Sequence, residues 1–151
     1  MSGFFYVLDD VSRILFVDDD PILREFAQVN LASPHCEIEV AVDGAEALAR
    51  LAACNYDAVL LDLEMPVMDG FTALAMLRAD PRTAHLAVIV QTGREDVEAI
   101  DKAFRLGATS FVTKPLNWRL LTYQLRYVLR ASAAERGVRA AAEALARSEA
   151  A

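Results

Sequence analysis

Five short apolar segments alternate along this chain with segments of helical periodicity, and that alternation sets the fold class. The predicted strands are residues 13–17, 36–42, 57–61, 86–90 and 109–113. The predicted helices are residues 21–32, 44–53, 71–79, 95–106 and a last helix that begins after Asn117. Parallel strands need crossover connections, and helices are the usual ones, so this order predicts a doubly wound α/β domain. The expected structure is a five-stranded parallel sheet in the order 2-1-3-4-5, with helices on both faces and an extended last helix.

The segment from Ala58 to Gly70 contains the first candidate site residue. Its apolar run from Ala58 to Leu61 suits a strand that is buried on both faces, and Asp62 follows where that strand would end. Ligands bind at the carboxyl ends of the strands in open α/β sheets, so a carboxylate at this position is placed for chemistry. Taken alone, Asp62 is equally explained as a capping residue.

Polar residues also follow three other predicted strands. Asp18 and Asp19 follow the first strand, Thr92 the fourth and Lys114 the fifth. In the order 2-1-3-4-5, the ends that carry these residues and Asp62 are expected to meet at one edge of the sheet. Each of these residues alone is weak evidence for a site. Their meeting at one edge of the sheet would be strong evidence.

The charges at this edge predict its chemistry. Several carboxylates in one place repel one another and raise the pKa of at least one of them unless a cation neutralises them. Ligands that are all oxygen atoms favour Mg²⁺, with Mn²⁺ as a possible substitute. With the metal bound, an ionised Asp62 can attack a phosphoryl group in line, while Lys114 and the Thr92 hydroxyl contact phosphoryl oxygens. The alternative for Lys114 is a structural salt bridge to Asp62, and both interpretations can hold in turn.

Four ordered motifs carry a family resemblance. They are ILFVDDDP, LLDLEMPVMDG, VIVQTG and FVTKPL, within a region from about Arg13 to Leu129. They resemble the receiver domain of bacterial two-component response regulators, which has a flavodoxin-like fold. Because the four motifs coincide in the family's order, the resemblance is far more specific than any one of them.

The resemblance implies a phosphoacceptor and a set of metal ligands. Asp62 would be the phosphoacceptor and a metal ligand. Asp19 would bind Mg²⁺ directly, Asp18 through a water molecule, and Glu64 through its backbone carbonyl.

The resemblance also implies a switch. Thr92 would be the switch hydroxyl, Lys114 the cation that pairs with the phosphoryl group, and Gly93 the small residue that leaves room for it. Phe111 takes the place of the switch aromatic, where the family often has Tyr. Phe retains the aromatic contact but has no hydroxyl to form a hydrogen bond after turning inward.

A phosphorelay follows from this resemblance, in place of an independent enzyme activity. A phosphohistidine on a sensor histidine kinase or a phosphotransfer protein would donate the phosphoryl group to Asp62. The domain would catalyse only its own phosphorylation and dephosphorylation. The switch would change the face formed by helix 95–106, strand 109–113 and the last helix, and with it homodimerisation and control of an output module.

Two other interpretations of these residues compete with the receiver. The run from Asp18 to Asp20 also resembles the DxD nucleophile motif of haloacid-dehalogenase-type phosphatases, which likewise form an aspartyl phosphate. Those enzymes would have Thr or Val two positions beyond Asp20, where Ile22 stands, and they leave Asp62 unexplained. The other interpretation is a degenerate receiver that serves only for docking, and the complete set of site residues argues against it.

Two charged residues are expected on opposite lips of the site, with Gly93 beside them. Glu64 lies two positions after Asp62, and Arg94 lies two positions after Thr92. A salt bridge between them would obstruct the in-line approach of the water that hydrolyses the aspartyl phosphate. The alternative is two independent, solvated side chains.

Composition restricts the possible partners. The formal charge of -7 and the pI near 4.8 argue against direct binding to nucleic acid, whose phosphates need a basic face. The apolar stretches are too short and too interrupted to cross a bilayer, and the first residues lack the basic start of a secretory signal. A cytoplasmic location, with no membrane contact, is the expectation.

The domain organisation is predicted as an N-terminal lead-in at 1–12, a receiver at 13–130 and a helical linker at 131–151. In the linker, a seven-residue spacing places Ala131, Val138 and Leu145 on one stripe, which is typical of a weak coiled coil. The alternative is an isolated, fraying helix. The segment is similar to linkers that join receivers to PAS sensors and to diguanylate cyclase or phosphodiesterase modules, so we expect an output module outside these residues.

Overall fold

A computed structural model describes residues 11–93 and 97–150. Its sheet contains β1 (Ser12–Val17), β2 (Cys36–Ala41), β3 (Ala58–Asp62), β4 (Ala87–Thr92) and β5 (Ser110–Thr113). All four strand pairings are parallel, and the strand order is β2-β1-β3-β4-β5. The fold class predicted from the alternation is therefore confirmed.

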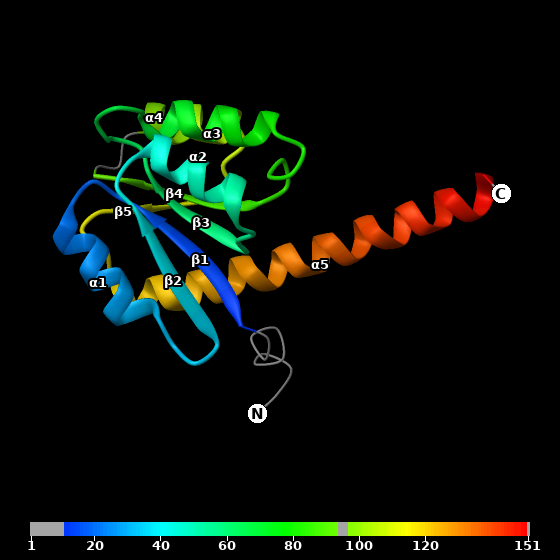
Figure 1. Cartoon of the computed structure of the whole chain (residues 1–151), viewed down its shortest axis with the longest axis horizontal. Helices are drawn as coiled ribbons and strands as arrows, with labels where there is room; N and C mark the ends of the chain where they lie inside the picture. The colour runs from blue at the N-terminus through cyan, green and yellow to red at the C-terminus, as the bar shows by residue number, and fades with distance from the viewer. Residues whose placement is uncertain (1–10, 94–96, 151) are drawn as a thin grey trace.

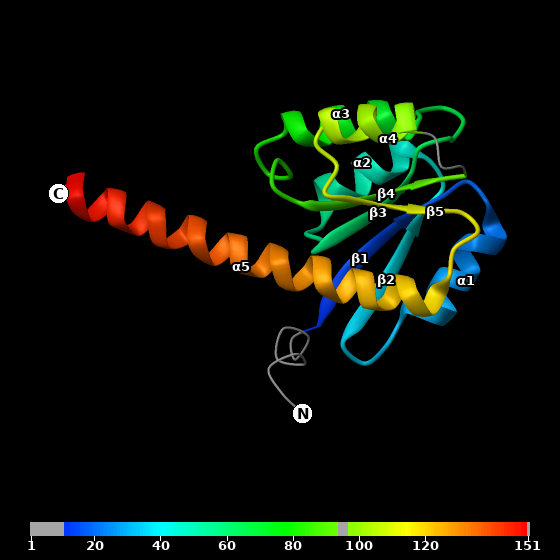
Figure 2. The same ribbon diagram turned by 180° about the vertical axis from the view of Figure 1, so that it is seen from behind.

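Five helices cover the two faces of this sheet. They are α1 (Pro21–Leu31), α2 (Gly44–Ala53), α3 (Gly70–Ala79), α4 (Val97–Arg105) and α5 (Trp118–Ala150). Helices α2, α3 and α4 lie on one face, and α1 and α5 lie on the other (Figures 1 and 2). Each face has its own apolar core, because successive strand residues point to opposite sides of the sheet.

The strand residues alternate between these two cores. Leu15 and Val59 pack beneath α2 and α3, whereas Phe16 and Leu60 pack against α1 and α5. All four side chains are fully buried. Continuous apolar runs are what a parallel sheet covered on both faces requires, and the central strands β1, β3 and β4 contain such runs. The edge strand β2 is less buried, and its apolar residues alternate with Glu37 and Glu39.

Aspartates begin three helices on the side of the sheet where the strands end. They are Asp20 before α1, Asp43 before α2 and Asp69 before α3. In the first of these, the Asp20 side chain accepts a hydrogen bond from the backbone N–H of Ile22 at 2.9 Å. At α3, a Cβ on Gly70 would overlap the carbonyl oxygen of Asp62, so only glycine allows this helix to begin so close to the end of β3.

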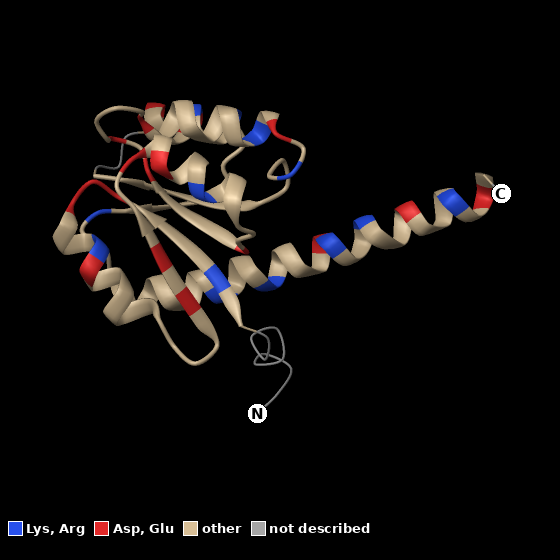
Figure 3. Cartoon of the chain, in the orientation of Figure 1, with Lys and Arg blue, Asp and Glu red and all other residues tan. Residues whose placement is uncertain are grey.

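Helix α5 extends far beyond the sheet (Figure 1). Its 33 residues correspond to about 50 Å of helix. The side chains of Leu121, Leu125 and Val128 are buried against the sheet, whereas Val138 and Leu145 are 70% and 60% exposed. Acidic and basic residues both occur along the projecting part (Figure 3). Within the described residues, no helix combines the length and the hydropathy needed to cross a membrane.

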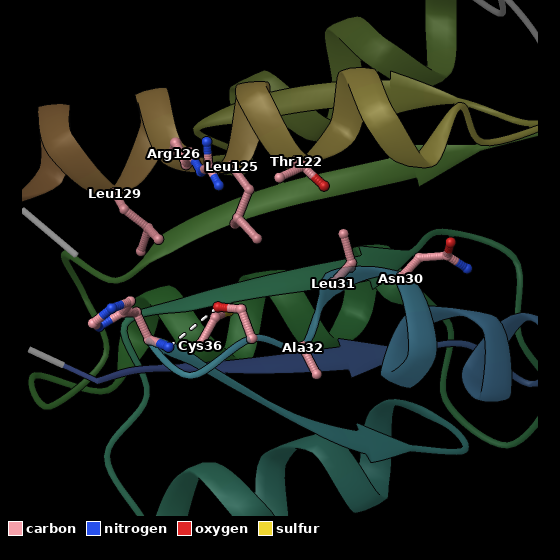
Figure 4. Close-up of a pocket in the computed structure, with 10 residues that line it drawn as sticks. Asn30, Leu31, Ala32, Cys36, Thr122, Leu125, Arg126 and Leu129 are labelled. Atoms are coloured by element: carbon pink, nitrogen blue, oxygen red, sulfur yellow. Dashed lines mark hydrogen bonds between the residues drawn. The ribbon is translucent and has the colours of Figure 1, made fainter. Parts of the chain in front are cut away.

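A hollow of about 280 Å³ lies between the end of α1 and the first turns of α5 (Figure 4). Leu31, Leu125 and Leu129 line it, together with Cys36 at the start of β2. Because β2 begins there, the hollow is at the amino-terminal edge of the sheet. It is thus at the opposite edge from the predicted site.

Candidate functional site

Asp18 and Asp62 are side by side at the carboxyl-terminal edge of the sheet. Val17 pairs with Leu61 in the β1–β3 register, so the next residue of each chain segment is an aspartate. Asp18 is fully buried and Asp62 is 3% exposed. Two carboxylates that water barely reaches must be compensated by a cation or protonated.

Lys114 supplies a cation to both of them. Its Nζ lies 2.9 Å from Oδ2 of Asp18 and 3.1 Å from Oδ2 of Asp62. The backbone N–H of Lys114 donates to the carbonyl of Thr92 at 2.8 Å, which fixes the end of β5 beside β4. The structural salt bridge considered for Lys114 is therefore present in this structure.

Asp18, Asp19 and Asp62 form an acidic cluster that fits a divalent cation. One carboxylate oxygen from each residue lies within 4.8 Å of the others. Asp19 is exposed to solvent, which gives an ion a route to the two buried carboxylates. Because all three donors are anionic oxygens, their chemistry suits Mg²⁺ or Mn²⁺ better than a metal that prefers nitrogen or sulfur ligands.

The environment of Asp62 shifts its protonation. Burial, followed by the charge of Asp18, raises the pKa of Asp62 to about 6, although Lys114 and the Glu64 backbone N–H oppose the rise. Burial lowers the pKa of Lys114, but its contacts with Asp18 and Asp62 outweigh burial and leave that pKa raised. Lys114 is thus held in the charged form. Its single positive charge is smaller than the negative charge of the two carboxylates when both are ionised.

Thr92, Gly93 and Glu64 surround the mouth of the site. Thr92 is the last residue of β4, is 3% exposed and pairs with Thr113. A Cβ on Gly93 would meet no atom within 4 Å among the described residues, so open space lies beside this residue. The backbone N–H of Glu64 donates to Oδ1 of Asp62 at 3.3 Å, and its side chain is exposed. Arg94, the other predicted lip, lies outside the described residues.

Phe111 points outward, away from the carboxylates. Its side chain is 39% exposed, and its ring meets that of Phe104 on α4 edge to face, with centroids 6.2 Å apart. The predicted switch aromatic is therefore in an outward position in this structure.

Sequence reasoning missed two residues near the carboxylates. The guanidinium of Arg24 donates from Nη1 to the carbonyl oxygen of Asp18 at 2.8 Å, so it holds the loop that carries Asp18 and Asp19. Gln91 lies in β4 directly beside Asp62 and is fully buried. Its signal in the sequence is a polar residue directly after the apolar run 86–90, a pattern that predicts the end of the strand.

Comparison with known proteins identifies the family. The sequence matches the response regulator receiver domain family over residues 14–126. The chain belongs to this family. The receiver fold is also that of the Vibrio cholerae chemotaxis protein CheY4, with a TM-score of 0.74 and 30% identity over 78% of this chain and 98% of that one. The phosphatase interpretation is therefore wrong, and Asp20 instead caps α1.

The relatives of this receiver domain have different outputs. The chain is 34% identical over 118 residues to the DNA-binding dual master transcriptional regulator RpaA of Synechocystis, covering 78% of this chain and 49% of that protein. It is 38% identical over 124 residues to a probable cyclic di-GMP phosphodiesterase of Vibrio cholerae, covering 80% of this chain and 28% of that protein. The receiver thus spans about half of the first relative and less than a third of the second.

Proposed function

We propose that this receiver domain is a phosphoryl-acceptor switch in which Asp62 is the phosphoacceptor. The observation that carries the proposal is the contact of one cation, Lys114, with two buried carboxylates at 2.9 and 3.1 Å. An anionic oxygen, an adjacent cation and a cluster suited to a metal are the components that phosphoryl transfer needs, because positioning and charge neutralisation are its main demands.

In this transfer the phosphoryl group passes from a nitrogen atom to an oxygen atom. An Asp62 carboxylate oxygen attacks phosphorus, the P–N bond of a phosphohistidine breaks, and the imidazole nitrogen keeps the electron pair and takes a proton. Hydrolysis later breaks the bond between Asp62 and phosphorus and releases phosphate. Lys114 pairs with one phosphoryl oxygen, and the Thr92 hydroxyl donates to another.

Asp19 and Asp62 would hold Mg²⁺ directly, with the Glu64 backbone carbonyl as a further ligand and Asp18 acting through water. When bound, the ion neutralises the charge that develops on the phosphoryl oxygens. The donor is a sensor histidine kinase or a phosphotransfer protein, as the family implies.

The proposed output is a change on the face formed by α4, β5 and α5. Thr92 moves toward the phosphoryl group and Phe111 turns inward, which shifts the population between two packed states. Since the proposed boundary between the receiver at 13–130 and the linker at 131–151 lies within one continuous helix, a change on this face passes into the projecting part of α5.

We propose a homodimer through the stripe of Ala131, Val138 and Leu145, tighter after phosphorylation. In this proposal the linker connects the receiver to an output module. The relatives with known names include a transcriptional regulator and a probable phosphodiesterase. The receiver's acidic charge supports contact with proteins and not directly with nucleic acid. Sedimentation with and without beryllofluoride, a stable mimic of the phosphorylated state, tests this, and an unchanged dimer fraction would contradict it.

Phosphorylation itself is tested with acetyl phosphate, Mg²⁺ and intact-mass spectrometry. The wild type should gain one phosphoryl group, and Asp62→Asn or the addition of a chelator should abolish the gain. Asp20→Asn is the matched control, because it changes a neighbouring aspartate that caps α1 and should be labelled as the wild type is. Equal labelling of Asp62→Asn would contradict the proposal.

A further inference from the structure

Gln91 is a buried amide for which the packing of β4 gives no reason. Its side chain is fully buried, and neither Oε1 nor Nε2 has a hydrogen-bond partner among the described residues. Removing an amide from water without giving it a partner costs free energy. This cost would be offset in another state of the protein, one in which the amide forms a hydrogen bond.

Sheet geometry places this amide beside the phosphoacceptor. Gln91 pairs with Asp62 in the β3–β4 register, and Leu60 and Ile89, two positions earlier on each strand, both pack against α1 and α5. Since side chains alternate along a strand, Gln91 and Asp62 point to that same face, on strands about 5 Å apart. The neighbour on the other side is Val112, which has no polar side chain. Asp62 is therefore the lateral partner that can accept a hydrogen bond.

Each oxygen of Asp62 has one donor in this structure. Oδ2 faces Nζ of Lys114 at 3.1 Å, and Oδ1 accepts from the backbone N–H of Glu64 at 3.3 Å. If Oδ1 forms the bond to phosphorus and Lys114 moves to the phosphoryl group, Oδ2 remains as the carbonyl oxygen of Asp62. One of its two lone pairs would ligate the metal, and the other would lose its donor in a buried place, beside the unpartnered amide.

We propose that Gln91 is a positioning residue for the phosphorylated state, and that its Nε2–H donates to the Asp62 oxygen that Lys114 releases. The inference rests on the proposed function of Asp62 and Lys114. Movement of Lys114 then allows the Gln91 amide and the Asp62 oxygen to become hydrogen-bond partners. The hydrogen bond exists only in the phosphorylated state, so it favours that state over the resting one.

The proposal predicts opposite effects on the two states when the amide is removed. Gln91→Met retains a long, unbranched side chain without the amide group. The resting protein should become more stable, because a buried unpartnered group is lost. Affinity for beryllofluoride in the presence of Mg²⁺ should fall at least about threefold, the change expected for one lost hydrogen bond.

The experiment measures the melting temperature and beryllofluoride affinity of the wild type, Gln91→Met and Gln91→Leu. Gln28→Met is the matched control, because Gln28 is exposed on α1, and it should change neither quantity. A higher melting temperature with unchanged beryllofluoride affinity in both Gln91 variants would show a purely structural residue and overturn the inference. The proposed function fails separately, through labelling of Asp62→Asn by acetyl phosphate.

Discussion

The ring of Phe111 in β5 packs edge to face against the ring of Phe104 in α4, with centroids 6.2 Å apart. Such a pair contributes roughly 0.5–1.5 kcal/mol beyond the area it buries. The contact joins β5 to α4, two of the three elements that the proposed switch would rearrange. It therefore stabilises the outward position of Phe111 against the inward one.

Removing this contact should favour the phosphorylated state. Phe104→Ala deletes the partner ring, so the inward population of Phe111 should rise by roughly two- to tenfold and acetyl phosphate should label Asp62 faster. The measurement is the initial rate of labelling. Met76→Ala, at an exposed position on α3, is the control and should leave the rate unchanged. An unchanged or slower rate for Phe104→Ala would show that the outward contact does not oppose activation.

Magnesium should stabilise the wild type through the acidic cluster. At a tenfold excess over its dissociation constant, a ligand that binds only the folded state adds about 1.4 kcal/mol to the free energy of unfolding. Asp19→Asn should lose most of this gain while changing the metal-free stability little, because Asp19 is exposed. Denaturation with and without Mg²⁺ measures the gain. Asp101→Asn, at an exposed position on α4, should retain it, and an equal gain in Asp19→Asn would place the ion elsewhere.

The pair predicted from sequence at the mouth of the site is tested by a double-mutant cycle. If Glu64 and Arg94 obstruct water, Glu64→Ala and Arg94→Ala should each speed dephosphorylation, and the double variant should be barely faster than either. The effect on stability should be small, about 0.2–1 kcal/mol, because an exposed ion pair contributes little. Loss of phosphate over time measures the effect. Simple additivity would show that the two residues act separately.

Sequence patterns predicted the fold because burial on both faces requires continuous apolar strands. The end of β4 was less predictable, since we placed it at Val90. Backbone pairing carries the strand on through Gln91, opposite Asp62, and Thr92, opposite Thr113. A polar residue inside a parallel strand contradicts the apolar pattern, and only the register shows that it belongs to the sheet.

The turn after β3 shows a second limit of sequence patterns. Pro66 and the pair Asp69-Gly70 are residue types that favour a sharp turn, but the positive φ, at 69°, occurs at Val67. Gly70 is instead required by the close approach of α3 to the Asp62 carbonyl. Gly107, soon after the end of α4, has a φ of 105°, in the left-handed region where glycine commonly ends a helix. The outward position of Phe111 was also unpredictable, because a strand pattern does not set a side-chain rotamer.

The strained backbone at Val67 gives a stability prediction. The N–H of Met68 donates to the carbonyl of Pro66 at 2.8 Å, a γ-turn in which a β-branched central residue with positive φ is unfavourable. Val67 is 85% exposed, so Val67→Gly loses little packing and should raise the free energy of unfolding by up to about 1 kcal/mol. Val138→Gly, at an exposed helical position, should lower it by about 0.3–0.5 kcal/mol. Urea denaturation distinguishes the two, and destabilisation by Val67→Gly would exclude strain at this turn.

The hydroxyl of Tyr56 gives a pH-dependent prediction away from the site. It donates to Oε1 of Glu39 at 2.6 Å, and burial, followed by this contact, raises the pKa of Tyr56 to about 12. A pKa raised by folding favours the protonated form, so the contribution is complete below pH 10 and is lost as the pH rises toward 12. Tyr56→Phe should therefore be less stable than the wild type by roughly 1–2 kcal/mol at pH 7.

Above pH 10 this stability gap should narrow, because ionisation weakens only the protein that has the hydroxyl. Urea denaturation of both proteins at pH 7, 9 and 10.5 measures the gap. The two proteins share all other titratable groups, so the effect of those groups on stability is the same in both at each pH. Tyr127→Phe is the control, because its hydroxyl is on an exposed side chain of α5 and its removal should leave stability unchanged. A gap that stays constant with pH would mean that the Tyr56 hydroxyl does not stabilise the fold through Glu39, and that the lost contribution comes from packing alone.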